Sequence, residues 1–137
     1  MTPEDNIKIA KKAYADFQSG NIPGILAALD DNIEWTTADI PEMAGTGAVK
    51  GKDKVLTFFK TVGETWDFQA FEPKEYIASG DQLVVLGSYR PRSRKTGNTV
   101  SAAWAMAWRF RNGKVTHFQE YTDSAALRSA LTARASA

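Results

Sequence analysis

The residue of this chain best placed for chemistry is a glutamate near its C-terminal end, Glu120. It lies in an alternating run, residues 114–122, which follows the turn signal Asn112-Gly113 and pairs across it with residues 99–111. One face of that earlier strand bears large apolar side chains: Trp104, Met106 and Trp108. Pairing across the turn puts Phe118, Glu120 and Thr122 on the same face.

A carboxyl group among aromatic rings is poorly solvated, and poor solvation raises its pKa toward neutrality. The pattern therefore favours Glu120 as a general acid or base. Two other interpretations stay open: a buried glutamate bonded to a nearby hydroxyl, and an edge-strand glutamate in solvent.

Two further acids, Asp39 and Glu42, lie in a segment without periodicity, residues 38–50. The segment is interpreted as a loop long enough to form a lid over a pocket. Two carboxyl groups in different environments can divide the acid and base roles, so Asp39 is a candidate partner for Glu120. The alternative is that both loop acids are solvated.

Large apolar residues recur at positions that would line a pocket beside Glu120. The expected ligand-binding residues are Tyr14, Phe17, Trp35, Phe59, Trp66, Trp104, Met106, Trp108 and Phe118. Tyr14 is also interpretable as a core residue with a satisfied hydroxyl, and Trp35 as a packing residue. Trp66 would either form a wall of the pocket or close the core.

The elements that position these residues follow from caps and periodicity. Thr2-Pro3 starts a helix that ends at Gly20, and Asn21 caps a second short helix. The remaining expected elements are a turn at 30–32, a strand at 33–37, a helix from 51 to 66, strands at 67–79, 83–92, 99–111 and 114–122, and a helix at 124–133. This order predicts one α+β domain over residues 1–137. We expect a cone: a curved antiparallel sheet wrapped around a long N-terminal helix, with the helices on one face.

The other face of the central strand is made of small side chains: Ser101, Ala103, Ala105 and Ala107. Small residues allow a second sheet to approach closely, so we predict an isologous homodimer through this face. The alternatives are cover by the C-terminal segment and a small-residue face in solvent.

Composition excludes several classes of function. The formal net charge is +1 and there is no cysteine, so neither a global basic field nor a thiolate site is expected. His117 is the only histidine, and strand parity turns it away from Glu120, so an interface or surface position is favoured. We expect no metal, no cofactor and no nucleic-acid partner, and we interpret the basic cluster Arg90, Arg92, Arg94 and Lys95 as a solvated hairpin end. No apolar run approaches the ~20 residues of a membrane helix, and no signal peptide is evident, so no membrane contact and a cytoplasmic location are expected.

Four segments resemble the nuclear-transport-factor-2-like superfamily, and within it the SnoaL-like group. They are ADFQSGNIPGI (15–25), DDNIEW (30–35), GDQLVVLG (80–87) and NGKVTHFQEYTD (112–123). The resemblance runs nearly end to end and implies the cone fold. The superfamily includes ketosteroid isomerase, polyketide cyclases, limonene-epoxide hydrolase, scytalone dehydratase and non-catalytic binding domains, so fold alone does not assign function.

The residues of ketosteroid isomerase are not retained here. By alignment, the position of its aspartate base falls at Thr36 and that of its protonated acid at Met106. The position of its tyrosine falls at or beside Ala13, with Tyr14 one residue away. Isomerisation by that mechanism is therefore rejected. The SnoaL-like cyclases need only one carboxylate in an apolar cavity, a requirement that Glu120 would meet.

These observations favour a small-molecule enzyme of the cyclase, isomerase or dehydratase type. It would use cofactor-free acid/base catalysis on a small hydrophobic ligand. The alternative is a non-catalytic module of the same fold that binds a hydrophobic ligand. A third hypothesis, a protein-interaction adaptor, predicts an exposed apolar patch beyond the dimer face.

Overall fold

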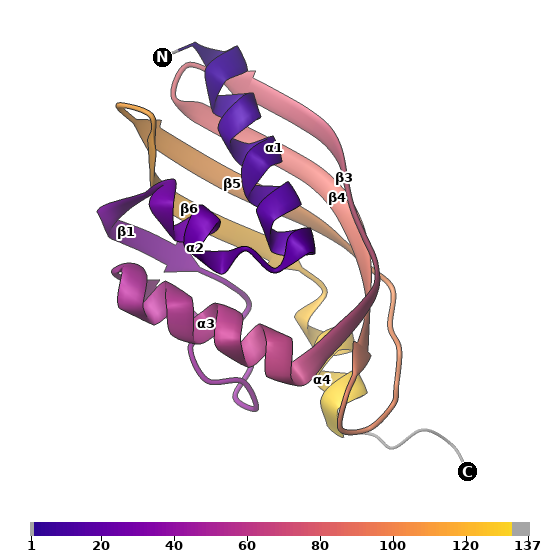
Figure 1. Cartoon of the computed structure of the whole chain (residues 1–137). Helices are drawn as coiled ribbons and strands as arrows, with labels where there is room; N and C mark the ends of the chain where they lie inside the picture. Colours follow the sequence, from indigo (N-terminus) through magenta and orange to yellow (C-terminus); the bar gives the residue numbers. More distant parts are fainter. Residues whose placement is uncertain (1, 133–137) are drawn as a thin grey trace.

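A curved sheet wraps around the N-terminal helix in the computed structural model, which describes residues 2–132 (Figure 1). The helices are α1 (Pro3–Ser19), α2 (Ile22–Ala27), α3 (Lys52–Thr65) and α4 (Ser124–Thr132). The strands are β1 (Leu29–Thr36), β2 (Ala48–Lys50), β3 (Trp66–Ser79), β4 (Gln82–Ser93), β5 (Ala102–Arg111) and β6 (Lys114–Thr122). The predicted α+β class and the cone are confirmed.

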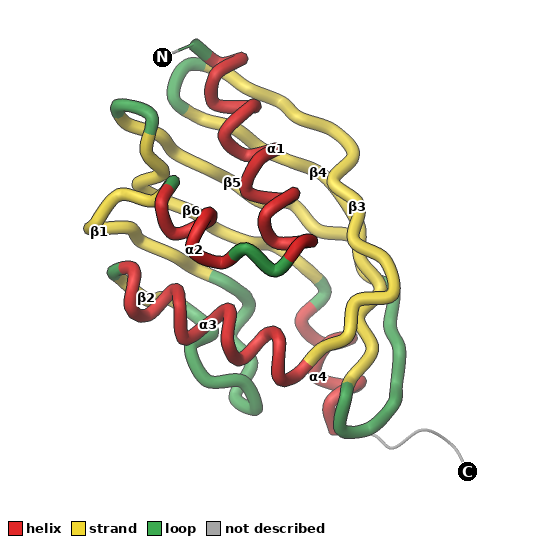
Figure 2. The backbone as a smooth tube through the Cα atoms, viewed as in Figure 1, coloured by secondary structure: helices red, strands yellow, loops and turns green. Residues whose placement is uncertain are grey.

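The six strands follow the order β2-β1-β6-β5-β4-β3 (Figure 2). Consecutive strands from β3 to β6 pair antiparallel, as expected for strands joined by short turns. β1 instead pairs parallel with β6, so the sheet is mixed and the prediction of a wholly antiparallel sheet is wrong. More than half of the chain separates β1 from β6, and no hairpin turn dictates their relative direction.

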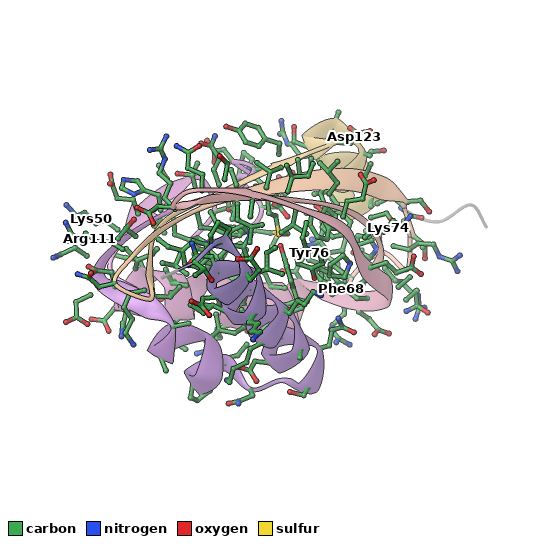
Figure 3. The ribbon with its side chains drawn as sticks, turned by 90° about the horizontal axis from the view of Figure 1, so that it is seen from above. Lys50, Phe68, Lys74, Tyr76, Arg111 and Asp123 are labelled. Atoms are coloured by element: carbon green, nitrogen blue, oxygen red, sulfur yellow. The ribbon has the colours of Figure 1, made fainter. Side chains whose placement is uncertain are left out.

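Helix α1 covers the concave face of the sheet. A capping box joins Thr2 and Asp5 at its start, and Gly20, with φ 78°, ends it in the left-handed conformation that glycine tolerates. Figure 3 shows Phe68 and Tyr76 of β3 on the side of the sheet that faces α1, whereas Asp123 lies on the outer side. The core therefore lies between α1 and the concave face.

The predicted alternation in β5 is confirmed. The side chains from Ala102 to Phe110 at even positions are buried, and those between them are exposed or half-buried. Asn112 (φ 52°) and Gly113 (φ 77°) both have positive φ, as a two-residue type I′ hairpin turn requires. The turn pairs Arg111 with Lys114 and Phe110 with Val115, and a β-bulge at Thr116 then shifts the register by one residue, so that Met106 pairs with Glu120.

Three local predictions need correction. Asp30 to Asn32 form no turn between elements but belong to β1, where the register against β6 shifts between Leu29 and Glu34. These residues still form a local turn-like hydrogen bond within the irregular part of β1, where Asn32 N–H donates to Asp30 Oδ1 at 2.8 Å. Residues 48–50 of the expected loop form β2, and Trp66 begins β3 instead of ending α3. The last helix begins at Ser124 as predicted, and Ala133, its expected end, lies outside the described residues.

Gly87 of β4 is required by close packing in the sheet. A Cβ atom there would lie 2.4 Å from Trp104 Cζ2 and 2.5 Å from the Glu72 carbonyl oxygen. We expect Gly87→Ala to destabilise the fold by about 1–3 kcal/mol in urea unfolding, because backbone and a buried indole must move. Gly63→Ala in α3, where nothing lies within 4 Å, is the control and should stabilise by about 0.5–1 kcal/mol. Equal stability of Gly87→Ala and the wild type would contradict this packing.

Candidate functional site

A cavity of about 100 Å³ lies between α1, α3 and the concave face of the sheet. An apolar cavity of about 150 Å³ binds benzene, so this space suits a small ring compound. Its wall is mostly aromatic and aliphatic, with Glu120 as the only charged side chain among the described residues that line it. The cavity can therefore hold a small hydrophobic ligand beside a single carboxyl group.

Glu120 projects from β6 into this cavity, the face that was predicted for it, because the β-bulge at Thr116 shifts the register of β6 against β5 by one residue. Tyr89 O–H donates to Glu120 Oε2 at 3.3 Å and lies 2.8 Å from Thr122 Oγ1, and the Ala38 backbone N–H also bonds the carboxylate. Burial raises the pKa of Glu120 to about 7, while the bonds from Tyr89 and Ala38 act in the opposite direction. Near neutral pH this carboxyl group therefore exists in both protonation states.

Tyr14 lines the cavity from α1 and its hydroxyl is fully engaged. It accepts a hydrogen bond from Trp108 Nε1 and donates one to Met106 Sδ, both at 3.2 Å. Burial raises the pKa of Tyr14 far above its ordinary value, so the phenol stays protonated. Thus Met106, at the position of an acid in the isomerase, serves here as a weak acceptor for Tyr14.

The structure places eight of the nine expected ligand-binding residues on the cavity wall: Tyr14, Phe17, Trp35, Phe59, Trp66, Met106, Trp108 and Phe118. Trp35 of β1 stacks on Phe118 of β6 with ring centroids 4.0 Å apart. Trp104 is the exception: it is buried, but it packs behind Phe71, with ring centroids 5.5 Å apart, and against Gly87. Whether the eight bind a ligand stays a prediction.

Asp39 is not brought to Glu120. Its side chain is exposed, lies beside Gly47 and does not line the cavity. Glu42 is also exposed, with its Oε1 3.6 Å from Arg128 Nε. The loop places its apolar side chains toward the cavity and its acids in solvent, because burying apolar side chains is favourable and burying unpaired charges is costly.

The same loop forms a fixed part of the wall. Ile40 and Met43 are buried and line the cavity. Thr46 Oγ1 lies within 3.0 Å of the Ile40 backbone N and O and 2.9 Å from the Met43 carbonyl oxygen, and so ties the loop together. A loop that is bonded internally and buried on one side does not match the expectation of a free lid.

Several wall residues were missed in the sequence: Thr37, Phe58, Phe68, Phe71 and Tyr89. Tyr89 follows Leu83 and Val85 at inward parity in β4, a signal that was present. Phe68 and Phe71 break simple alternation because the β3 register shifts between Phe68 and Ala70. A register shift of this kind is not visible in the residue pattern.

The remaining candidates lie away from the cavity. His117 is exposed on the outer face and pairs with Glu34. Arg90, Arg92, Arg94 and Lys95 are exposed as well. Over residues 2–132 no group of three or more potential metal ligands occurs, and no helix there is long and apolar enough to cross a membrane.

Several solved structures are similar to this chain in sequence and fold. An NTF2-like protein of unknown function from Burkholderia pseudomallei K96243 is 30% identical, with a TM-score of 0.87 over 97% of this chain and 100% of that chain. An NTF2-like protein from Burkholderia xenovorans LB400 is 28% identical, with a TM-score of 0.86 over 96% and 99%. TerC co-crystallised with polyporic acid is 25% identical, with a TM-score of 0.84 over 94% and 99%.

No curated protein matches the chain. A family model does match: the SnoaL-like domain aligns with residues 10–118, which is most of the sequence and includes α3 and the central strands. The resemblance noted in the sequence is thereby confirmed. The chain belongs to the family of SnoaL-like domains.

Proposed function

We propose that this protein is a small-molecule enzyme of the cyclase, isomerase or dehydratase type, with Glu120 as its general acid and base. The observation that carries the proposal is one carboxyl group, with a pKa raised to about 7, on the wall of an otherwise apolar cavity. A group with its pKa near the working pH is well suited to take up and return a proton.

The shared chemical step is removal of a proton from carbon next to a carbonyl group. The ionised Glu120 takes this proton, and the electron pair of the C–H bond moves to the carbonyl oxygen to give an enolate. Protonated Glu120 can return the proton to another carbon, which is isomerisation. Alternatively the enolate carbon attacks a second carbonyl of the same molecule and protonated Glu120 gives its proton to the resulting alkoxide, which is cyclisation. In dehydration the enolate expels a β-hydroxyl group, which takes the proton from Glu120 and leaves as water.

The wall also supports a small hydrophobic substrate. Stacked rings such as Trp35 and Phe118 offer flat apolar surface, and no lysine, arginine or histidine is among the described residues that line the cavity. The structure of TerC with polyporic acid, in a protein 25% identical, supports a small-molecule ligand for this fold. The catalytic arrangement of ketosteroid isomerase does not apply to this site, because Thr36 does not line the cavity and Met106 accepts a hydrogen bond from Tyr14.

A non-catalytic ligand-binding module is the second candidate. One observation favours it: the Tyr14 hydroxyl is engaged by Met106 and Trp108 and is not free for a substrate. The two candidates differ in whether a bound ketone exchanges its α-hydrogens. 2-Tetralone, a compact two-ring ketone, incubated with the protein in D₂O separates them: an enzyme accelerates deuterium uptake, whereas a binding module binds without doing so.

We propose further that the protein forms a homodimer through the outer face of the sheet. On this face Ala105 pairs with Leu86 and Ala107 with Val84 of β4, and Ala105 pairs with Tyr121 of β6 on its other side. Tyr121 and Ile77 are 55% and 57% exposed. Covering such a surface with a second copy removes apolar area from water.

Sedimentation velocity tests this surface. We expect the wild type to sediment as a dimer and Ala105→Arg as a monomer, because each copy would have to bury a guanidinium group without a partner in the interface. Ala15→Arg on the exposed side of α1 makes the same change away from the sheet and should stay dimeric. A dimeric Ala105→Arg variant, or a monomeric wild type, would contradict the proposal.

A further inference from the structure

We propose that Thr37 positions a carbonyl oxygen of the ligand beside Glu120, and that the ligand class is therefore a neutral ring ketone. The inference rests on the proposed function, because it concerns the same cavity. It adds the identity of the hydrogen-bond donor and the polarity of the ligand.

The Thr37 hydroxyl is a buried polar group without a partner. Thr37 is 6% exposed and lines the cavity, and its Oγ1 has no hydrogen-bond partner among the described residues. Its backbone N–H, by contrast, donates to the Gly47 carbonyl oxygen at 3.1 Å. Buried side-chain hydroxyls in folded proteins are nearly always satisfied, so an orphaned one on a cavity wall indicates a group that a ligand completes.

The other hydroxyl groups on the described wall are already engaged. Tyr14 donates to Met106, Tyr89 lies within bonding distance of Glu120 and Thr122, and Thr46 bonds backbone atoms of its own loop. A ligand oxygen that used any of these would have to displace an existing bond. Thr37 can donate without such a loss.

Thr37 is also in the right place relative to Glu120. In the parallel pairing of β1 and β6, Trp35 is opposite Phe118 and Thr36 is opposite Gln119. Continuing this register brings Thr37 opposite Glu120, and the next residue, Ala38, bonds the Glu120 carboxylate through its backbone N–H. In a ketone, the carbonyl oxygen lies close to the hydrogen on the adjacent carbon. A hydrogen-bond donor (Thr37) beside a base (Glu120) can therefore contact both atoms at once.

A second unpartnered donor lies on the same wall. Trp35 Nε1 has no hydrogen-bond partner among the described residues, and Trp35 precedes Thr37 by two residues on the same inward face. The Thr37 hydroxyl and the Trp35 indole N–H can both donate a hydrogen bond, which favours a ligand with acceptor oxygens on the side that faces them. Ionised Glu120, with no cation among the described wall residues, disfavours an anionic ligand, and this leaves a neutral ketone.

Binding of two probes tests the assignment. 2-Tetralone bears the ketone, and tetralin has the same rings without oxygen. Tryptophan fluorescence titrations at pH 6, where Glu120 is mostly protonated, report binding because Trp35, Trp66 and Trp108 line the cavity. Thr37→Val removes the hydroxyl at nearly constant shape, Thr37→Ser retains it, and Thr36→Val removes a hydroxyl one residue away that does not face the cavity.

We expect Thr37→Val to weaken 2-tetralone binding by about three- to ten-fold, the usual net value of one hydrogen bond, and to leave tetralin binding unchanged. Thr37→Ser and Thr36→Val should bind 2-tetralone like the wild type. Thermal unfolding checks that each variant folds, and Thr37→Val should be at least as stable as the wild type because it loses an unsatisfied group.

Equal binding of 2-tetralone by Thr37→Val and the wild type would overturn the assignment. An equal loss for both probes would also overturn it, since it would show a packing effect. Failure of the wild type to bind either probe would overturn both this inference and the proposed ligand cavity. Thr37-dependent binding without deuterium uptake would support the inference while refuting the catalytic proposal.

Discussion

Replacing Glu120 by glutamine is expected to slow the protein-catalysed exchange of the α-hydrogens of 2-tetralone in D₂O by about 10²–10⁴-fold. Glutamine keeps the size and polarity of the side chain but cannot accept the proton. The cavity offers no substitute, because Glu120 is the only carboxylate on the described wall. Mass spectrometry of the recovered ketone measures the deuterium uptake.

The pH dependence of this exchange has a definite sign. The base is the carboxylate form, so the rate should rise with pH and level off above the pKa of Glu120, with a midpoint near 7. An unperturbed glutamate would instead reach its plateau by about pH 5–6. The midpoint therefore tests whether burial in the cavity raises the pKa of Glu120.

Glu75→Gln is the matched control for this exchange. Glu75 is exposed on β3 and does not line the cavity, so the substitution should leave the rate unchanged. A Glu120→Gln variant that retains the wild-type rate would refute the acid/base assignment. A wild type that binds 2-tetralone and exchanges no faster than solvent would identify a binding module.

The hairpin that carries Glu120 could be predicted from local chemistry, but the face on which Glu120 lies could not. Asn112-Gly113 predicts the two-residue turn, but strict alternation from that turn would pair Met106 with Gln119 and leave Glu120 on the outer face. A register shift between Arg109 and Phe110, with Thr116 as the extra residue of β6, turns Glu120 inward, so its predicted position depends on a bulge that the residue pattern does not show. The alternation of side chains also does not show which inward residues reach the cavity. Trp104 and Trp108 lie on the same face of β5, yet only Trp108 lines the cavity, because Phe71 of β3 covers Trp104.

The β1 side of the site depends on contacts between distant segments. β1 joins β6 in parallel, and no turn in the sequence encodes that pairing. The orphaned hydroxyl of Thr37 is likewise invisible in the sequence, because it depends on which acceptors all the packed elements provide. Asp39 was expected near the cavity because its loop follows the first strand and would lie at the mouth of the cone, but the burial of Ile40 and Met43 orients the loop otherwise.

Glu120→Gln is also expected to stabilise the protein at high pH and to have little effect at low pH. The pKa of Glu120 rises from near 4.5 to about 7 on folding, so the folded state binds the proton more tightly than the unfolded state. The contribution of protonated Glu120 is fully present below about pH 4.5 and is lost as pH rises through 7. At about 1.4 kcal/mol per pKa unit, the loss approaches 3 kcal/mol above pH 8.

Thermal unfolding of wild type and variant across pH 5–9 measures this difference directly. Other groups titrate equally in both proteins, so the gap in Tm isolates Glu120. It should be small at pH 5 and grow to about 10 °C by pH 9, given a few degrees per kcal/mol for a chain of this size. Glu75→Gln, which changes an exposed carboxyl group, should follow the wild type throughout.

A gap that does not change with pH would contradict the raised pKa of Glu120. A gap that grows as predicted would show that the wild type retains a destabilising carboxylate in its core above neutral pH. Replacing this side chain with glutamine removes that penalty, so stability alone gives no reason for a glutamate at this position. If the same variant also exchanges α-hydrogens more slowly, the stability lost to this carboxylate is explained by its role in proton transfer.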